Sequence, residues 1–310
     1  MNLAPVILFV YNRLEHTKKT VEALKNNDQA DETELFIYSD NYKANSDDKN
    51  KSKVKEVRDY IKTVEGFKEV HIIESEKNKG LASSIITGVT EVIDKYEKAI
   101  VLEDDLVTSN KYLQYMNNAL EVFRDKNHIW SISGYTPPID FKGYNQDLYI
   151  TRRGCSWGWA TWKNRWSTIN WEKEYYKQGL KDKKIRKAFN GTGYDMSYML
   201  ELQAEGNIDS WAIRWCYNQF IQNKYTIYPV KSFVKNIGTD NSGTHSGDTK
   251  KYDVHISLNT EIIVSDNIIE NKEISKRFRK FYSPMLKIVL SKYARKIRIY
   301  NIIRAIIYSK

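Results

Sequence analysis

The chain has 310 residues, enough to bury a full hydrophobic core in one large domain, with or without appendages. Its two cysteines, Cys155 and Cys216, lie far apart and lack metal-site spacing, which argues against a disulfide framework or structural zinc site and favours a reducing compartment. The net charge of +10 is uneven: residues 274–310 hold eleven Lys or Arg and no acid, leaving 38 basic against 39 acidic residues elsewhere.

The first 110 residues alternate short apolar runs with polar, helical patterns. The apolar runs predict strands, and apolar residues at helical spacing predict the helices between them. Strands are expected at Val6–Tyr11, Glu34–Ser39, Val70–Ile73 and Ala99–Leu102, and helices at His16–Asn26, Asp48–Val64 and Leu81–Tyr96. This β-α-β-α order implies a parallel sheet with right-handed crossovers.

Three consecutive carboxylates, Glu103, Asp104 and Asp105, follow the fourth predicted strand. Adjacent anions repel one another, so the group requires a cation or hydrogen-bond donors to neutralise it. Oxygen-only ligation suits Mg²⁺ or Mn²⁺ bridging to a phosphate-bearing substrate better than zinc, which prefers His or Cys. The alternative is an ordinary solvated acidic turn.

The first three predicted strands also end in polar turns. Tyr11, Asn12 and Arg13 follow the first strand, Asp40 follows the second, and Lys79 and Gly80 follow the third. In a parallel sheet these turns emerge at one edge, beside the acidic triplet, so we expect a single pocket there. Each residue also has a simpler interpretation, as a surface ion pair for Arg13 or a turn residue for Asp40 and Gly80. Gly-rich dinucleotide and P-loop motifs are absent, so phosphate would be held by a metal, a basic side chain and a helix N-terminus.

Beyond residue 110 the pattern changes. Helices are predicted at Lys111–Phe123, Asp182–Phe189, Tyr194–Ala204 and Trp211–Asn223, and a strand at Ile129–Ser133. Residues 151–172 hold Trp157, Trp159, Trp162, Trp166 and Trp171, a density too high for an ordinary core. The segment Lys235–Thr249 is small and polar, which is typical of a loop or lid.

Several short motifs occur in one order along the chain. They are Y-N-R at 11–13, S-D at 39–40, N-K-G-L at 78–81, V-L-E-D-D-L at 101–106, S-I-S-G-Y at 131–135, R-R-G-C-S-W-G-W-A-T-W at 152–162, D-S-W-A-I-R-W at 209–215 and T-H-S-G at 244–247. Together they resemble GT-A-fold glycosyltransferases, with the closest likeness to N-acetylglucosaminyltransferase I and its bacterial sugar-transferase relatives. The resemblance implies a Rossmann-like α/β fold with a mixed, mostly parallel sheet flanked by helices, and a nucleotide-sugar donor.

The resemblance also implies residue roles. Asp105 would bind the metal, Glu103 and Asp104 would face the ribose or sugar of the donor, and Asp40 would read the uracil base of a UDP-sugar. Arg13 and Lys79 would lie near the base or the diphosphate, with Tyr11, Asn12 and Gly80 in the same donor site. His245 would approach the diphosphate or metal from a loop that orders over the donor; the alternative is a solvated loop histidine.

An inverting transfer requires a carboxylate that takes the proton of the acceptor hydroxyl. Asp209 is our choice, although Ser210 stands where the family's base falls in the simplest alignment, and Glu201 and Glu205 are the alternatives. Trp159, with Trp157, is predicted to form a wall on which a sugar ring stacks. The alternative places these aromatics at the junction between the sheet and the later helices.

The basic end of the chain mixes apolar and cationic residues over 284–310. It is too charged to span a bilayer, and no run reaches the roughly 18 apolar residues that a span needs. An amphipathic basic helix is typical of an anionic membrane surface, whereas the alternative is a helix packed on the body. The start of the chain shows no signal peptide. We therefore expect a cytoplasmic protein at the inner face of the membrane, and no nucleic-acid partner, because no nucleic-acid-binding fold is recognisable.

These features predict a metal-dependent, inverting glycosyltransferase that passes a sugar from a UDP-sugar to a glycan or lipid-linked precursor of a surface polysaccharide. We expect a nucleotide-sugar-binding half at 1–110, an acceptor-binding and catalytic half at 111–265, and a basic helical tail at 266–310. Two alternatives stay open: a nucleotidyltransferase that makes the activated sugar, and a non-catalytic, membrane-associated glycan-binding protein on the same scaffold.

Overall fold

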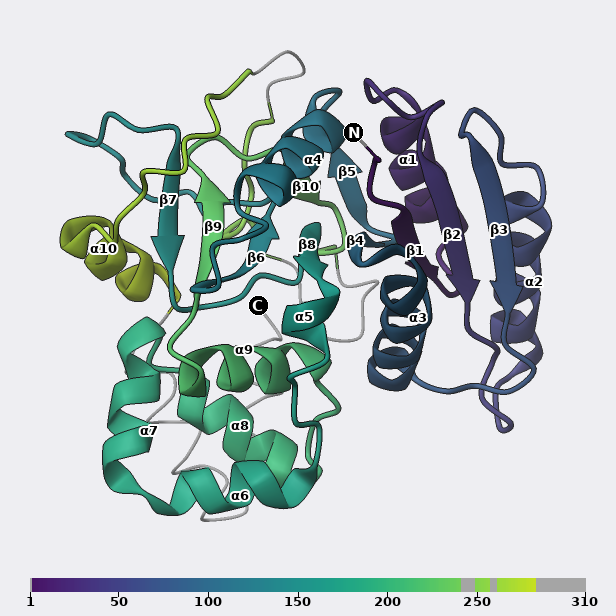
Figure 1. Cartoon of the computed structure of the whole chain (residues 1–310). Helices are drawn as coiled ribbons and strands as arrows, with labels where there is room; N and C mark the ends of the chain where they lie inside the picture. The colour runs from purple at the N-terminus through teal and green to yellow at the C-terminus, as the bar shows by residue number, and fades with distance from the viewer. Residues whose placement is uncertain (1, 241–248, 257–260, 283–310) are drawn as a thin grey trace.

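The computed structural model describes residues 2–240, 249–256 and 261–282. One large sheet carries helices on both faces, and a group of helices, α6 to α9, lies beyond one end of it (Figure 1). The fold is the predicted mixed α/β architecture of the GT-A type. His245 and the basic segment from residue 283 onward lie outside the described residues.

The first part of the chain forms four successive strands with a helix after each of the first three. These elements are β1 (Val6–Val10), α1 (Leu14–Lys25), β2 (Glu34–Ser39), α2 (Asp48–Ile61), β3 (Glu69–Glu74), α3 (Leu81–Tyr96) and β4 (Lys98–Glu103). Neighbouring strands pair in parallel, as the alternating sequence pattern predicts. Two elements, β2 and α3, begin and end at their predicted residues.

The second part of the chain adds shorter strands and more helices. These are β5 (Leu106–Thr108), α4 (Tyr112–Val122), β6 (Ile129–Ser133), β7 (Leu148–Thr151), β8 (Trp159–Trp162), α5 (Lys163–Trp166), α6 (Lys173–Lys181), α7 (Lys183–Phe189), η1 (Asn190–Thr192), α8 (Met196–Glu205), α9 (Trp211–Ile221), β9 (Tyr225–Pro229), β10 (Val234–Asn236) and α10 (Lys272–Tyr282). Strands β5, β7, β8, β9 and β10 were not predicted, because runs this short carry little periodicity. The predicted loop at Lys235–Thr249 is therefore wrong at its start, where residues of β10 pair with β5.

The large sheet has the strand order β3-β2-β1-β4-β8-β6-β9-β7. Strands β8 and β7 run antiparallel to their neighbours, and the other described strands of this sheet share one direction. The carboxyl ends of β1 to β4 consequently lie along one edge. Because β6 and β9 continue the same direction, that edge extends across both predicted halves of the chain, which share this sheet.

Strand β1 shows why this sheet needs helices on both faces. All five of its residues are buried. Alternate side chains point to opposite faces, so Leu8 joins a core with Leu24 of α1 and Met116 of α4, whereas Phe9 joins a second core with Val89 of α3. A continuous apolar run is typical of such a doubly covered parallel strand.

Helix α10 packs beside β7, the last strand in the order of the sheet (Figure 1). The Phe278 ring lies 6.2 Å from the Tyr149 ring of β7 and 5.2 Å from the Tyr228 ring of β9, measured between centroids. Tyr282 lies over the guanidinium of Arg153, which is itself paired with Asp195 beside α8 at 2.8 Å. The described start of the predicted tail thus belongs to the folded body. None of the described helices is long and apolar enough to cross a bilayer.

Candidate active site

The ends of β1 to β4 lie level along the carboxyl edge. Val10 pairs with Ser39, Ser39 pairs with Glu74, and Phe9 pairs with Glu103 in the parallel registers. The turns that follow these strands therefore emerge side by side, as the parallel order predicts. They bring the predicted polar residues to one face of the domain.

The acidic triplet occupies the sharp turn between β4 and β5. Asp104 and Asp105 are only 4% and 8% exposed, so they do not form a solvated surface turn. The backbone is fixed as well: the Thr20 hydroxyl donates to the Asp104 carbonyl at 2.8 Å, and the Ile237 amide donates to the Asp105 carbonyl at 2.9 Å. A turn held this firmly presents its carboxylates at a defined place.

Arg13 lies directly against two of these carboxylates. Its Nη2 donates to Asp105 Oδ2 at 2.8 Å and also contacts Asp104 Oδ1, while Nε lies 3.4 Å from Asp104 Oδ2. Burial disfavours the charged guanidinium, but the two carboxylates raise the pKa of Arg13 above its ordinary value. Its second terminal nitrogen, Nη1, is buried and has no hydrogen-bond partner among the described residues.

The protein environment leaves the triplet short of positive charge. Burial, together with repulsion from Asp105 and Asp104, raises the pKa of Glu103 to about 8. Burial also raises the pKa of Asp104 to about 6, against the opposing effect of Arg13. One guanidinium therefore does not balance the buried acids, and a further cation would favour their ionised forms.

Asp40 holds the turn that leads into α3. Its carboxylate accepts hydrogen bonds from the amides of Lys79 and Gly80, both at 2.9 Å, and from Asn78 Nδ2 at 3.0 Å. Gly80 has φ +77°, a conformation that favours glycine at this position. The role of Asp40 in reading a base stays a prediction, and in the structure its carboxylate fixes the backbone of this turn. The Lys79 side chain is exposed at the same edge.

Tyr11 and Asn12 are tied to α2 through a residue that the sequence analysis did not select. Asn50 Nδ2 donates to the Tyr11 hydroxyl at 3.1 Å, and Asn12 Nδ2 donates to Asn50 Oδ1 at 2.6 Å. The backbone amide of Asn50 donates to the side chain of Asp47, the residue that caps α2. No sequence motif marks Asn50, since its role depends on α2 packing beside the end of β1.

Asp209, the proposed base, lies close to the turn that leads into α3. Its Oδ2 would be 3.9 Å from a Cβ atom on Gly80, and its side chain is 67% exposed. Ser210 caps α9, because its hydroxyl accepts from the Ile213 amide at 3.3 Å. Ser210 therefore has a structural role, as the N-cap of α9. Glu201 of α8, an alternative candidate for the base, pairs with Arg186 of α7.

Trp159 does not form a wall for a sugar ring, which corrects the sequence-based prediction. It is only 1% exposed and packs against the rings of Trp166, Trp211 and Trp215, with centroids 5.0 to 5.7 Å apart. Trp159, Trp166 and Trp171 thus belong to the core between β8 and the helices around α9, whereas Trp162 and Trp157 pack into the core on the other face of the sheet. Trp157 is partly buried and stands edge-on to the Tyr135 ring, 4.7 Å away.

The chain after β10 crosses the acidic turn. A Cβ atom on Gly238 would overlap Asp105 Oδ2 and would lie 2.9 Å from Arg13 Nη1, so any side chain at 238 would displace these groups. Further along, Asp240 Oδ2 lies 3.2 Å from His16 Nε2 on α1. We call residues 237–240 the strap. The sequence showed a flexible loop here, but nothing indicated that it touches Arg13.

The donor chemistry of the triplet fits a hard divalent ion, since it offers only oxygen ligands. Among the described residues, the group whose possible ligand atoms all lie within 4.8 Å of one another is a different one, Glu34, Glu69 and His71. It lies at the starts of β2 and β3, which is the opposite edge of the sheet. Lys68 already pairs with Glu34 there at 3.1 Å. The predicted metal position at Asp105 is therefore separate from this group.

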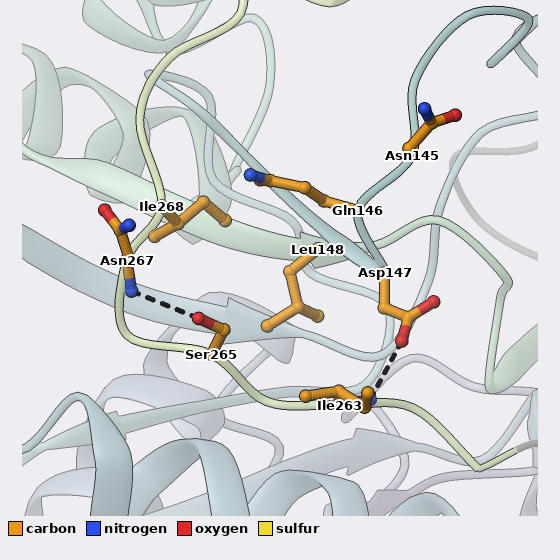
Figure 2. Close-up of a pocket in the computed structure, with 8 residues that line it drawn as sticks. All are labelled: Asn145, Gln146, Asp147, Leu148, Ile263, Ser265, Asn267 and Ile268. Atoms are coloured by element: carbon orange, nitrogen blue, oxygen red, sulfur yellow. Dashed lines mark hydrogen bonds between the residues drawn. The ribbon is translucent and has the colours of Figure 1, made fainter.

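A shallow hollow elsewhere on the surface is unrelated to the strand ends. Figure 2 shows it between the approach to β7 and the segment 263–268, where Asp147 accepts from the Ile263 amide at 2.9 Å. Strands β8, β6 and β9 separate β7 from β4 in the sheet. The hollow therefore adds nothing to the acidic turn.

Comparisons with individual known proteins find only distant similarity. A search of curated proteins finds no match. Among solved structures, S. aureus TarS is similar with 15% identity and a TM-score of 0.30, over 47% of this chain and 24% of that one. GlyE of Streptococcus pneumoniae TIGR4 is similar with 11% identity and a TM-score of 0.33, over 74% and 45%. The chain thus spans less than half the length of either protein.

The family comparison covers most of the sheet and the turns that follow β1 to β4. The sequence model described as "Glycosyl transferase family 2" matches residues 6–190, a span that begins with β1 and contains Arg13, Asp40 and the acidic turn. The more specific resemblance to N-acetylglucosaminyltransferase I stays a prediction. On the match over residues 6–190, this chain belongs to glycosyl transferase family 2.

Proposed function

We propose that this glycosyltransferase is metal-dependent and inverting, and that it takes its sugar from a nucleotide donor, a UDP-sugar in the first instance. The acceptor is a glycan or lipid-linked precursor of a surface polysaccharide. One observation carries the donor assignment: the buried acidic turn faces Arg13, and Nη1 of that arginine has no hydrogen-bond partner among the described residues. A site with both charges in place suits a diphosphate held with a divalent ion.

The triplet and Arg13 supply the contacts for the donor. Asp105 would hold Mn²⁺ or Mg²⁺, which when bound neutralises the diphosphate that leaves. Arg13 would donate from Nη1 to a phosphate oxygen, and Glu103 and Asp104 would face the ribose or sugar. Tyr11 and Asn12, fixed through Asn50, border the same turn. The backbone between Asn78 and Gly80, fixed by Asp40, closes the other side.

Asp209 acts as the base in this scheme. The acceptor oxygen forms a bond to the anomeric carbon from the face opposite the diphosphate, the bond from that carbon to the diphosphate oxygen breaks, and the acceptor proton passes to the Asp209 carboxylate. Its exposure leaves it open to an acceptor, and its place beside Gly80 keeps it near the donor turn. Asp209→Asn is expected to lower kcat by 10²- to 10⁴-fold, the usual contribution of a general base.

The direct test is release of nucleoside diphosphate from a panel of nucleotide sugars with Mn²⁺, followed with and without a chelator. Slow hydrolysis without acceptor, abolished by the chelator and restored by Mn²⁺, supports the proposal. Release of pyrophosphate would instead indicate a nucleotidyltransferase. Binding of nucleotide sugars with no turnover under any metal condition would indicate the non-catalytic scaffold.

The cytoplasmic, membrane-facing location is part of the same proposal. Eleven basic residues and no acid occupy 274–310, which suits an anionic lipid surface. The assay compares flotation of the full chain with liposomes against a chain ending after Tyr282, because Tyr282 still covers Arg153. Loss of flotation in the shortened chain supports the membrane address, and equal flotation removes it.

A further inference from the structure

Arg13 already pairs with the carboxylate that is proposed to hold the divalent ion. Asp105 Oδ2 accepts from Arg13 Nη2 at 2.8 Å. Arg13 is the first residue before α1 and its own backbone carbonyl accepts from the Thr17 amide at 2.9 Å, so the main chain beneath the guanidinium is fixed. The guanidinium therefore neutralises part of the triplet in the protein alone.

The surroundings limit where the guanidinium can go. Gly238 of the strap approaches both Asp105 Oδ2 and Arg13 Nη1 so closely that no side chain fits at that position. The strap is fixed on either side, by the Ile237 amide on the Asp105 carbonyl and by Asp240 beside His16. A divalent ion arriving at Asp105 would thus meet a guanidinium that stays close by, and the two positive charges would repel one another.

A diphosphate changes that balance, because it brings negative charge to both cations at once. Building on the proposed donor function, we propose that Arg13 is an internal counter-cation that couples the two ligands: it weakens binding of the divalent ion alone and makes ion and diphosphate bind cooperatively. Nη1, which has no hydrogen-bond partner among the described residues, is the group that would receive the diphosphate oxygen. Coupling of this kind is reciprocal, so each ligand raises the affinity for the other by the same factor.

The test measures Mn²⁺ affinity directly, from the electron paramagnetic resonance signal of free Mn²⁺, with and without UDP. Full-length protein should bind Mn²⁺ weakly alone and at least tenfold more tightly with saturating UDP. Arg13→Gln should bind Mn²⁺ alone at least tenfold more tightly than the unaltered protein, with the UDP effect reduced to threefold or less. Arg13→Lys keeps the charge and should bind Mn²⁺ alone as weakly as the unaltered protein.

Arg186→Gln is the matched control, since Arg186 pairs with Glu201 in the helical region. It should leave Mn²⁺ affinity and the UDP effect unchanged. Equal Mn²⁺ affinity in Arg13→Gln and the unaltered protein would overturn the inference. If Arg13→Gln fails to fold, the unaltered protein decides alone, because UDP that binds without tightening Mn²⁺ binding is equally incompatible with the coupling.

Failure of the donor assignment gives a different result. In that case neither UDP nor any nucleotide sugar of the panel binds, while the Mn²⁺-only comparison between Arg13→Gln and the unaltered protein still reports on the counter-cation.

Discussion

The donor-side turns and the tryptophan-rich region are both built from conspicuous residues, but they use them in opposite ways. At the carboxyl edge, Arg13, Asp104 and Asp105 contact one another directly in a buried polar group. Around β8, Trp159 and Trp215 are buried in the hydrophobic core. The difference teaches that a charged residue at a strand end is a better guide to a site than an unusual density of aromatic rings, because a buried charge is costly without a compensating partner, whereas a large apolar ring stabilises an ordinary core.

The largest expected effect is on the donor side, at the proposed metal ligand. Asp105→Asn removes a charged oxygen ligand and should lower turnover of the nucleotide sugar by about 10³-fold or more, since metal-assisted charge stabilisation is worth several kcal/mol. Steady-state kinetics at several Mn²⁺ concentrations checks this. Glu69→Gln is the matched control: it alters the acid group at the opposite edge and should leave the kinetics unchanged. The reverse outcome would move the metal to Glu34, Glu69 and His71.

On the aromatic side, the expected effect is on stability. Trp159→Ala should lower the free energy of unfolding by about 3–5 kcal/mol, the usual cost of emptying a buried aromatic site. Chemical denaturation measures it. Trp157→Ala serves as the comparison and should cost less, because Trp157 is only partly buried. A stable Trp159→Ala protein with a raised KM would restore the sugar-stacking role that its burial argues against.

A smaller loss is expected where the donor side depends on a backbone anchor. Asp40→Ala leaves the Lys79 and Gly80 amides without their acceptor and should cost about 1–3 kcal/mol, the penalty for unsatisfied buried polar groups. The KM for the donor should rise with it, because the turn before α3 loses its fixed position. Asp40→Asn keeps one acceptor oxygen, so its stability and its donor KM should lie between those of the unaltered protein and Asp40→Ala. Unfolding curves and donor KM, measured on the same variants, test the link.

The smallest effect is expected at the cap of α9. Ser210→Ala should destabilise the protein by about 1 kcal/mol, the typical value for losing a capping side chain. Ser210→Asn restores a cap and should recover most of that loss. A change in kcat far beyond the stability effect would instead give Ser210 a direct part in the reaction.

Much of the fold was predictable because long periodic segments determine it. β2 and α3 were predicted to the residue, and the parallel order followed from their alternation with other elements. The short strands β5 and β10 were not predictable, since their pairing joins residues far apart in sequence. Register between such strands depends on tertiary packing, which no local pattern encodes.

The site was predictable at the level of strand ends and not at the level of contacts. Parallel topology alone brought Arg13 toward the acidic turn. The strap over that turn could not be predicted, because Gly238 matters only through the atoms it approaches in space. Asn50 is similar: an asparagine within a charged helix shows no signal, yet it fixes both Tyr11 and Asn12.

The attachment of Asp40 to the backbone bears on any attempt to engineer donor preference. Replacing a side chain that recognises a base is the usual first step in changing nucleotide selectivity. Here that substitution would also release the amides of Lys79 and Gly80, so altered selectivity would come together with a loosened turn. A library of variants at Tyr11 and Asn12, with Asn50 varied alongside them, would change the turn after β1 instead. It would leave the hydrogen bonds between Asp40 and the turn before α3 intact.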